Sequence, residues 1–341
     1  RECPTGVDMA KMKIEVLAAR ANKNGVGLRE KLVAYLPRYA PVAARMPWLL
    51  NLRDQIPGLA FLTEKMLGLA KERQLPRWRS DWVKQPANPE HIPDVLLFAD
   101  TFNRYFEPEN IEAAVKVLAR AGFTVGQAVP EDSGRPLCCG RTFLSAGLVE
   151  QAKEEMRRTI RALEPALAKG ATIVGLEPSC VLTFRDEAPA LLGDDWQDIY
   201  AEQFLLFEEF IAKSLEEGRF DVPLASLPQS HALVHGHCHQ KAFNTMGALQ
   251  KTLRIIPELK VEVIASSCCG MAGSFGYQAE TLDVSMAMGE LNLLPKVRSA
   301  SEDNLIVAGG TSCRHQIADG ANKKAIHVAR VLCQASDLAM H

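Results

Sequence analysis

The chain repeats one order of apolar runs and cysteines, and this duplication restricts the fold more than any other feature. In each copy a short apolar run is followed by an amphipathic segment, a second apolar run, a Cys-Cys-Gly triplet, another helical pattern and a third apolar run that ends in cysteine. The corresponding segments are 95–101 and 232–238, 111–121 and 246–256, 123–125 and 261–264, 138–140 and 268–270, and 173–180 and 306–313. Short apolar runs suit buried strands, and alternating strands and helices require a parallel sheet with right-handed crossovers. We therefore predict an α/β protein with two tandem Rossmann-like parallel-sheet cysteine-rich domains.

The residues before the repeat have a different composition. Residues 9–21 have the apolar periodicity of a helix, and four prolines between residues 37 and 57 divide the next segment into short helices. Prolines and tryptophans between residues 76 and 93 are typical of an extended linker. The predicted parts are a helical arm with its linker (1–89), a first cysteine-rich domain (90–225) and a second one (226–341).

Length and charge exclude several classes of protein. The 341 residues suffice for about two domains, and 47% apolar with 23% charged residues is typical of a folded soluble protein. Lysine plus arginine (39) nearly balances aspartate plus glutamate (41), so no overall positive field favours nucleic acid. No uncharged apolar stretch approaches the length of about 18 residues that a membrane-spanning helix needs. The chain starts with Arg1 rather than methionine, and we expect it to be part of a longer protein.

Nine cysteines carry most of the chemical information. Their number is odd, and two pairs are direct neighbours, which could form a disulfide only with strain. Reduced thiols fit better, and they predict a cytoplasmic protein. In open parallel sheets the loops at the carboxyl ends of the strands converge, and the cysteines of the repeat fall there. We therefore predict that Cys238, Cys268, Cys269 and Cys313 form one metal site.

The type of metal follows from the ligands and their spacing. Thiolates favour an iron–sulfur cluster, zinc or copper(I). Structural zinc usually takes cysteine pairs separated by two to four residues, and the sequence contains no such pair. Neighbouring thiolates can instead ligate separate irons of a cluster, and the glycine after each pair lets the backbone approach closely. An iron–sulfur cluster in the second copy is the favoured prediction, and buried structural thiols are the alternative.

The first copy differs in one cysteine. It has Cys138, Cys139 and Cys180, whereas Thr101 stands where the second copy has Cys238. These three cysteines are either ligands of a cluster that another residue completes, or a remnant of the duplication. The ninth cysteine, Cys333, lies in an apolar helical run, and we expect it in the core.

Histidines surround the first cysteine of the second copy. Alternation along a strand places His235, His237 and His239 on one side, where they could ligate metal, hydrogen-bond a cluster or bind an anionic substrate. His315, two residues after Cys313, is a similar candidate. The alternative is a polar strand end whose histidines are satisfied by the backbone.

The duplicated Cys-Cys-Gly units, with His-Cys-His (237–239) upstream and Ser-Cys (312–313) downstream, resemble the cysteine-rich domains of heterodisulfide reductase. The sequence is most similar to the iron–sulfur subunits of glycolate and lactate oxidases and to the C-terminal half of fused FAD-linked D-2-hydroxyacid dehydrogenases. The fullest family pattern has one more cysteine in each copy, where this chain has Thr183 and Gln316. That difference argues against a non-cubane cluster with five cysteines.

The first residues resemble part of another motif. Arg1-Glu-Cys3-Pro4 is similar to the end of a bacterial ferredoxin motif, whose last cysteine precedes proline. This resemblance implies that Cys3 ligates a cluster completed by cysteines outside this chain.

The resemblance also implies an electron relay. FAD in an N-terminal domain of the same protein or complex takes two electrons from D-lactate, D-2-hydroxyglutarate or glycolate, and ferredoxin-type clusters carry them on. The cysteine-rich part then passes them, through a 4Fe-4S cluster, to a quinone or another acceptor. The chain has no Gly-x-Gly-x-x-Gly segment, and we expect neither a flavin site nor a catalytic residue within it.

Two other functions compete with this oxidoreductase. One is a structural zinc module that uses Cys238, His237 and His239, and the other is a thiol–disulfide redox domain that uses the neighbouring cysteines. The apolar side chains of the arm, around Trp48 and Phe61, either pack on a neighbouring domain or dock at the inner face of a membrane. The sequence leaves the hydroxyacid, the acceptor and the oligomeric state open.

Overall fold

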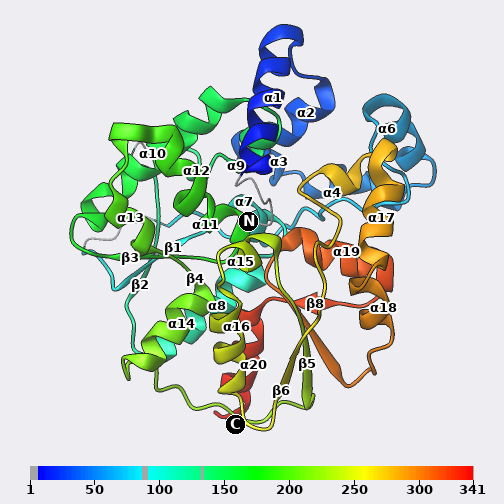
Figure 1. The fold of residues 1–341 in the computed structure, drawn as a ribbon. Coiled ribbons are helices and arrows are strands. Elements are labelled where there is room, and N and C mark those ends of the chain that lie inside the picture. The colour runs from blue at the N-terminus through cyan, green and yellow to red at the C-terminus, as the bar shows by residue number, and fades with distance from the viewer. Residues whose placement is uncertain (1–6, 87–90, 132–133, 341) are drawn as a thin grey trace.

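The computed structural model describes residues 7–86, 91–131 and 134–340. A helical arm is followed by two α/β units, and the fold is of the predicted α/β class (Figure 1). The arm helices within the described part are α1 (Met9–Asn24), α2 (Leu28–Ala34), α3 (Leu36–Ala43), α4 (Pro47–Leu50), α5 (Leu52–Gln55) and α6 (Leu59–Leu67). We call the part around the first sheet unit one and the part around the second sheet unit two.

Unit one contains a parallel sheet of four strands in the order β2-β1-β3-β4. The strands are β1 (Val95–Phe98), β2 (Val125–Gln127), β3 (Thr172–Gly175) and β4 (Phe204–Leu206). Its helices are α7 (Thr101–Tyr105), α8 (Pro108–Arg120), α9 (Arg141–Ser145), α10 (Val149–Leu167), α11 (Pro178–Val181), α12 (Thr183–Leu192), α13 (Asp198–Gln203) and α14 (Phe207–Glu216), with a 3-10 turn η1 (Gly193–Asp195). All four residues of β1 are buried, as expected for the central strand of a sheet covered on both faces.

Unit two has the same topology, with four parallel strands in the order β6-β5-β7-β8. The strands are β5 (His231–His235), β6 (Lys260–Val263), β7 (Asn304–Ala308) and β8 (Ala325–Ile326). Its helices are α15 (Cys238–Ala242), α16 (Met246–Arg254), α17 (Leu282–Glu290), α18 (Leu293–Arg298), α19 (Thr311–Ala321) and α20 (Val328–Leu338), with 3-10 turns η2 (Phe275–Tyr277) and η3 (Ala279–Thr281). The identical strand order confirms the predicted duplication.

One hydrophobic cluster is shared by the two units, and each unit has a further cluster of its own. Helices α8 and α14 of unit one pack against α20 and α16 of unit two, between the two sheets (Figure 1). One cluster of buried side chains therefore contains Val117 and Phe207 together with Leu253 and Leu332. The boundaries predicted near residues 90 and 226 stay predictions.

The arm covers the end of the molecule where the strands finish. Helices α1 and α2 contact α9, and α3 contacts α7, all at the carboxyl edge of the first sheet. The following residues reach unit two, where Ala70 N donates to Tyr277 O and the buried Arg73 donates to Gly276 O. The arm thus holds both units at the edge where the cysteines lie.

Part of the arm stays uncovered. Trp48 is 65% exposed and Met66 is 70% exposed, and Leu49, Leu50, Phe61 and Leu62 are also exposed. The two units of this chain therefore do not pack on this apolar face. Among the described residues, no helix is both long enough and apolar enough to span a bilayer.

Candidate metal centre

Unit two brings its four predicted ligands to the carboxyl edge of the second sheet. Cys238 is the first residue of α15, which begins three residues after the end of β5, and Cys313 lies in the first turn of α19, after β7. Cys268 and Cys269 lie in the loop that follows β6. Cys269 and Cys313 are buried, Cys268 is half-buried and Cys238 is exposed. The site therefore runs from the surface into the core of unit two.

The four thiols contact one another in a row. The sulfurs of Cys269 and Cys313 are 3.4 Å apart, and Cys268 is hydrogen-bonded to both Cys238 and Cys269. Its hydrogen bond with Cys238 lowers the pKa of Cys268 and raises the pKa of Cys238. The hydrogen bond with Cys269 lowers the pKa of Cys313 in the same way. Thiolate charge, which soft metals require, is thus favoured at Cys268 and Cys313.

The surroundings of these thiols are cationic or neutral. Lys241 donates to the carbonyl oxygens of Ser266 and Ser267, beside the loop that carries Cys268. His237 caps the helix that begins at Cys238, where its Nδ1 accepts from the backbone N–H of His239 at 3.2 Å. Positive charge near a thiolate stabilises its ionised form.

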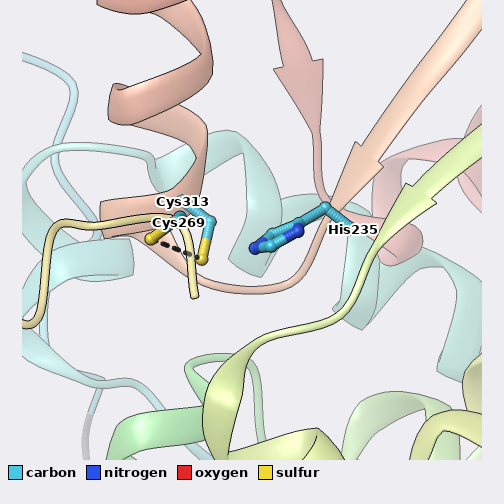
Figure 2. Close-up of side chains that lie close together, drawn as sticks. All are labelled: His235, Cys269 and Cys313. Carbon is cyan, nitrogen blue, oxygen red and sulfur yellow. Dashed lines mark hydrogen bonds between the residues drawn. The ribbon is translucent and has the colours of Figure 1, made fainter. Parts of the chain in front are cut away.

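One histidine reaches the thiols directly. His235 is the last residue of β5 and is fully buried. One nitrogen of its ring lies within 4.8 Å of the sulfurs of Cys269 and Cys313 (Figure 2). Its Nε2 has no hydrogen-bond partner. The sequence pattern singled out the stretch 235–239, but it favoured His237 and His239 because they flank Cys238.

The other predicted histidines have different partners. The His239 ring stacks on His237 at 5.1 Å, and its Nε2 lies 3.2 Å from Arg141 of unit one. Burial lowers the pKa of His239 to about 3, so the ring is neutral near pH 7. His315 Nδ1 is paired with the hydroxyl of Tyr277 at 2.6 Å. Each ring thus has a side-chain partner at one nitrogen rather than the backbone partner of the alternative prediction, and His239 Nδ1 is buried without a hydrogen-bond partner.

Each Cys-Cys-Gly triplet forms the same tight turn. The backbone N–H of Gly270 donates to Cys268 Sγ at 3.3 Å, and that of Gly140 donates to Cys138 Sγ at 3.4 Å. Gly270 has φ +95°, and a Cβ there would lie 2.1 Å from the carbonyl oxygen of Ser285 in α17. Only glycine allows this combination of left-handed backbone and close approach. The turn therefore places the backbone N–H of the glycine where it donates a hydrogen bond to the sulfur of the first cysteine.

We expect the substitution Gly270→Ala to lower the free energy of unfolding by about 3 kcal/mol, because a left-handed alanine and a backbone clash add up. Gly273→Ala is the matched control, since Gly273 also has a positive φ (+69°) but nothing lies near its missing Cβ. Its cost should be only about 1 kcal/mol. Urea denaturation of both variants measures the difference, and equal costs would show that the close approach to Ser285 is unimportant.

Unit one has an acidic environment around its three thiols. Cys138, Cys139 and Cys180 are buried, and Cys139 is hydrogen-bonded to both of the others. The hydrogen bond with Cys139 favours the Cys180 thiolate, but burial and the charges of Asp100 and Glu177 outweigh it and raise the Cys180 pKa to about 12. The charges of Asp100 and Glu177 therefore disfavour added negative charge at the Cys180 thiol.

At the position where unit two has Cys238, unit one has Thr101 in place of a fourth cysteine. Thr101 is buried as the first residue of α7, and the preceding Asp100 caps this helix by accepting from the N–H groups of Phe102 and Asn103. Asn103 Nδ2 donates to the second oxygen of Asp100 at 2.6 Å. Both oxygens of Asp100 are thus occupied by its own helix, although burial raises its pKa to about 6.

The sequence analysis also singled out Cys3, Gln316 and Cys333. Cys3 lies outside the described residues. Gln316, where the fullest family pattern has another cysteine, is fully buried and is hydrogen-bonded to Arg73 and to the carbonyl oxygen of Ser285. Cys333 lies on α20 and is half-buried, with Sγ 3.7 Å from Asp337 Oδ2, so it lies at the margin of the core that was predicted for it.

Comparisons with known proteins agree with this geometry. The model of the CCG family, described as "cysteine-rich domain", matches residues 99–185 and 232–318. One of the subunits of the anaerobic glycerol-3-phosphate dehydrogenase of Escherichia coli K12 is 24% identical over 94% of this chain and 81% of its own length. D-2-hydroxyglutarate dehydrogenase of the same organism is 25% identical over 93% of this chain, which spans only 31% of that relative. Lactate utilization protein A of Anoxybacillus flavithermus is 25% identical over 70% of this chain and 98% of its own length.

Proposed function

Because the chain belongs to the cysteine-rich domain (CCG) family, whose domain it contains twice, we propose that it is the iron–sulfur electron-transfer part of an FAD-linked dehydrogenase. The observation that carries the proposal is the row of four thiols at the carboxyl edge of the second sheet, where the strand ends gather residues from three separate segments. We assign Cys238, Cys268, Cys269 and Cys313 as the protein ligands. When bound, an iron–sulfur cluster accepts and returns single electrons.

The donor set fits such a group better than a single ion. Four thiols and a buried imidazole are more donors than tetrahedral zinc can take. The N–H of Gly270 already points at a thiol sulfur, which is the kind of hydrogen bond that tunes a cluster. Lys241 offsets the negative charge of thiolates. In unit one the buried carboxylates Asp100 and Glu177 would oppose that charge, so we assign the cluster to unit two.

The substrate proposal rests on the relatives. One is a D-2-hydroxyglutarate dehydrogenase, another belongs to a glycerol-3-phosphate dehydrogenase, and a third is named for lactate utilization. We propose a 2-hydroxyacid such as D-lactate, D-2-hydroxyglutarate or glycolate as the electron source, oxidised at FAD in a domain or subunit other than this chain. A quinone or another carrier would receive the electrons on the cytoplasmic side. The D-2-hydroxyglutarate dehydrogenases are about three times as long as this chain, which leaves room for the flavin part.

The decisive measurement is the iron, sulfide and zinc content of anaerobically purified protein, with low-temperature EPR before and after dithionite. We expect iron and sulfide in similar amounts and a signal that appears on reduction. Zinc without sulfide would instead establish the structural zinc module. Metal-free protein with a thiol whose alkylation abolishes activity would establish the thiol–disulfide domain.

A further inference from the structure

His235 lies in the deepest part of the thiol site. It is fully buried at the end of β5, and it forms a compact group with the buried Cys269 and Cys313 (Figure 2). The imidazole points from its strand toward the two sulfurs. The unpartnered Nε2 is costly in a protein interior unless something binds it.

The duplication shows that packing alone does not require an imidazole here. The position equivalent to His235 in unit one is Phe98, three residues before Thr101, just as His235 lies three residues before Cys238. Phe98 is buried and packs against Phe184 with ring centroids 5.5 Å apart. Unit one thus lacks two donors at once, and the fold accepts an apolar ring in place of the imidazole.

The contacts of Ser266 fit a His235 ring that carries its proton on Nδ1. His235 Nδ1 lies 2.9 Å from Ser266 Oγ, and the hydroxyl of Ser266 donates to the carbonyl oxygen of Ile264 at 3.4 Å. In the tautomer with the proton on Nδ1, Ser266 Oγ accepts from the ring while its own hydroxyl donates to Ile264. Nε2 then carries a free lone pair directed at the thiols. Metal-binding histidines commonly show this arrangement, with the second nitrogen donating to an outer partner.

We propose that His235 ligates iron in unit two through Nε2, alongside the cysteine thiolates, with Ser266 holding the ring. This inference rests on the proposed function, because it presupposes an iron–sulfur group. A neutral imidazole donates less negative charge than a thiolate, and histidine ligation raises the reduction potential of iron–sulfur centres. Unit two would therefore hold a cluster of higher potential than one ligated by cysteine alone.

The test is pulsed EPR on reduced protein that contains ¹⁵N-labelled histidine. A directly bound nitrogen gives strong hyperfine coupling to the cluster spin. We expect this coupling in the wild type and its loss in His235→Phe, which copies the residue of unit one. His231→Ala is the matched control, because His231 begins the same strand and is exposed, so its coupling should equal that of the wild type.

A second variant separates ligation from packing. His235→Cys should keep iron and sulfide, lose the nitrogen coupling and lower the midpoint potential, since a thiolate replaces a neutral donor. Weak coupling in the wild type, or strong coupling that persists in His235→Phe, would overturn the inference and leave the proposed function intact. Wild-type protein without iron and sulfide would overturn the proposed function, and the inference with it.

Discussion

Replacing Cys269 with serine is expected to remove the metal from unit two. Cys269 is buried in the middle of the thiol row, where it contacts both Cys268 and Cys313. Serine keeps the shape of the side chain but offers no soft ligand to iron. Iron content should fall below about one tenth of the wild-type value, since even the outer partners of metal ligands contribute 10–100-fold to affinity. The EPR signal of the reduced protein should disappear with the iron.

Two control variants make this result specific. Cys139→Ser changes the equivalent residue of unit one, and we expect it to leave iron and sulfide unchanged. Cys333→Ser changes a half-buried cysteine on α20, and it should behave in the same way. If Cys139→Ser also loses iron, unit one contains a cluster and the assignment to unit two alone is wrong.

The substitution Glu107→Gln should destabilise the contact between the units by about 3 kcal/mol, the lower end of the cost of breaking a buried ion pair, because Arg314 is buried while the Glu107 side chain is 18% exposed. Arg314 of unit two is only 4% exposed, and its Nε donates to Glu107 Oε1 of unit one at 2.8 Å. Its other nitrogens donate to Glu107 Oε2 and to the carbonyl oxygens of Ala308 and Gly309. Without the carboxylate, the guanidinium stays buried with its charge uncompensated.

The effect should depend on pH. Burial disfavours the Glu107 carboxylate, but the charge of Arg314 outweighs this and lowers the pKa from 4.5 to about 2. A depressed folded-state pKa stabilises the protein above the unfolded-state pKa, and this contribution is lost as pH falls through the folded-state value. The difference between wild type and Glu107→Gln should therefore be constant above about pH 5 and shrink between pH 4.5 and 2.

Denaturant unfolding over this pH range measures the prediction. Glu109→Gln is the matched control, because Glu109 also links the units, through Arg330 at 3.3 Å, but its side chain is 32% exposed. Glu109→Gln should lower the free energy of unfolding by less than about 1 kcal/mol. Similar costs for the two variants would show that the Glu107–Arg314 pair does not hold the units together.

Most of the secondary structure could be predicted from local patterns. The segments 111–121 and 246–256 were predicted as helices, and they correspond to α8 (Pro108–Arg120) and α16 (Met246–Arg254). The central strands of both sheets also lie where apolar runs predicted them. The fourth strands β4 and β8 were not predicted, because stretches of three and two residues are too short to show a period of their own.

Part of the candidate site was also predictable from the sequence. Cysteines at equivalent strand ends indicate one crevice, because parallel strands deliver their carboxyl ends to the same edge. The role of His235 needed the structure, since alternation along a strand gives the side of a residue but neither its burial nor its hydrogen bonds. Nor could the sequence show that the backbone N–H of Thr311, two residues before Cys313, donates to Glu177 of unit one at 2.9 Å.

The sequence by itself determined the duplication, the α/β class, the Cys-Cys-Gly turns and the gathering of four thiols in the second copy. These features follow from periodicity, strand order and local backbone requirements, which neighbouring residues encode. Only the tertiary structure decided the electrostatic difference between the two thiol sites and the contacts that join the units. Asp100 and Glu177 act on the Cys180 thiol of one site, and Lys241 lies beside Cys268, Cys269 and Cys313 of the other, because packing brings together residues that are far apart in the chain. Such long-range neighbours have no local signature, so their charges and proton positions emerge only when both sheets are packed on a common core.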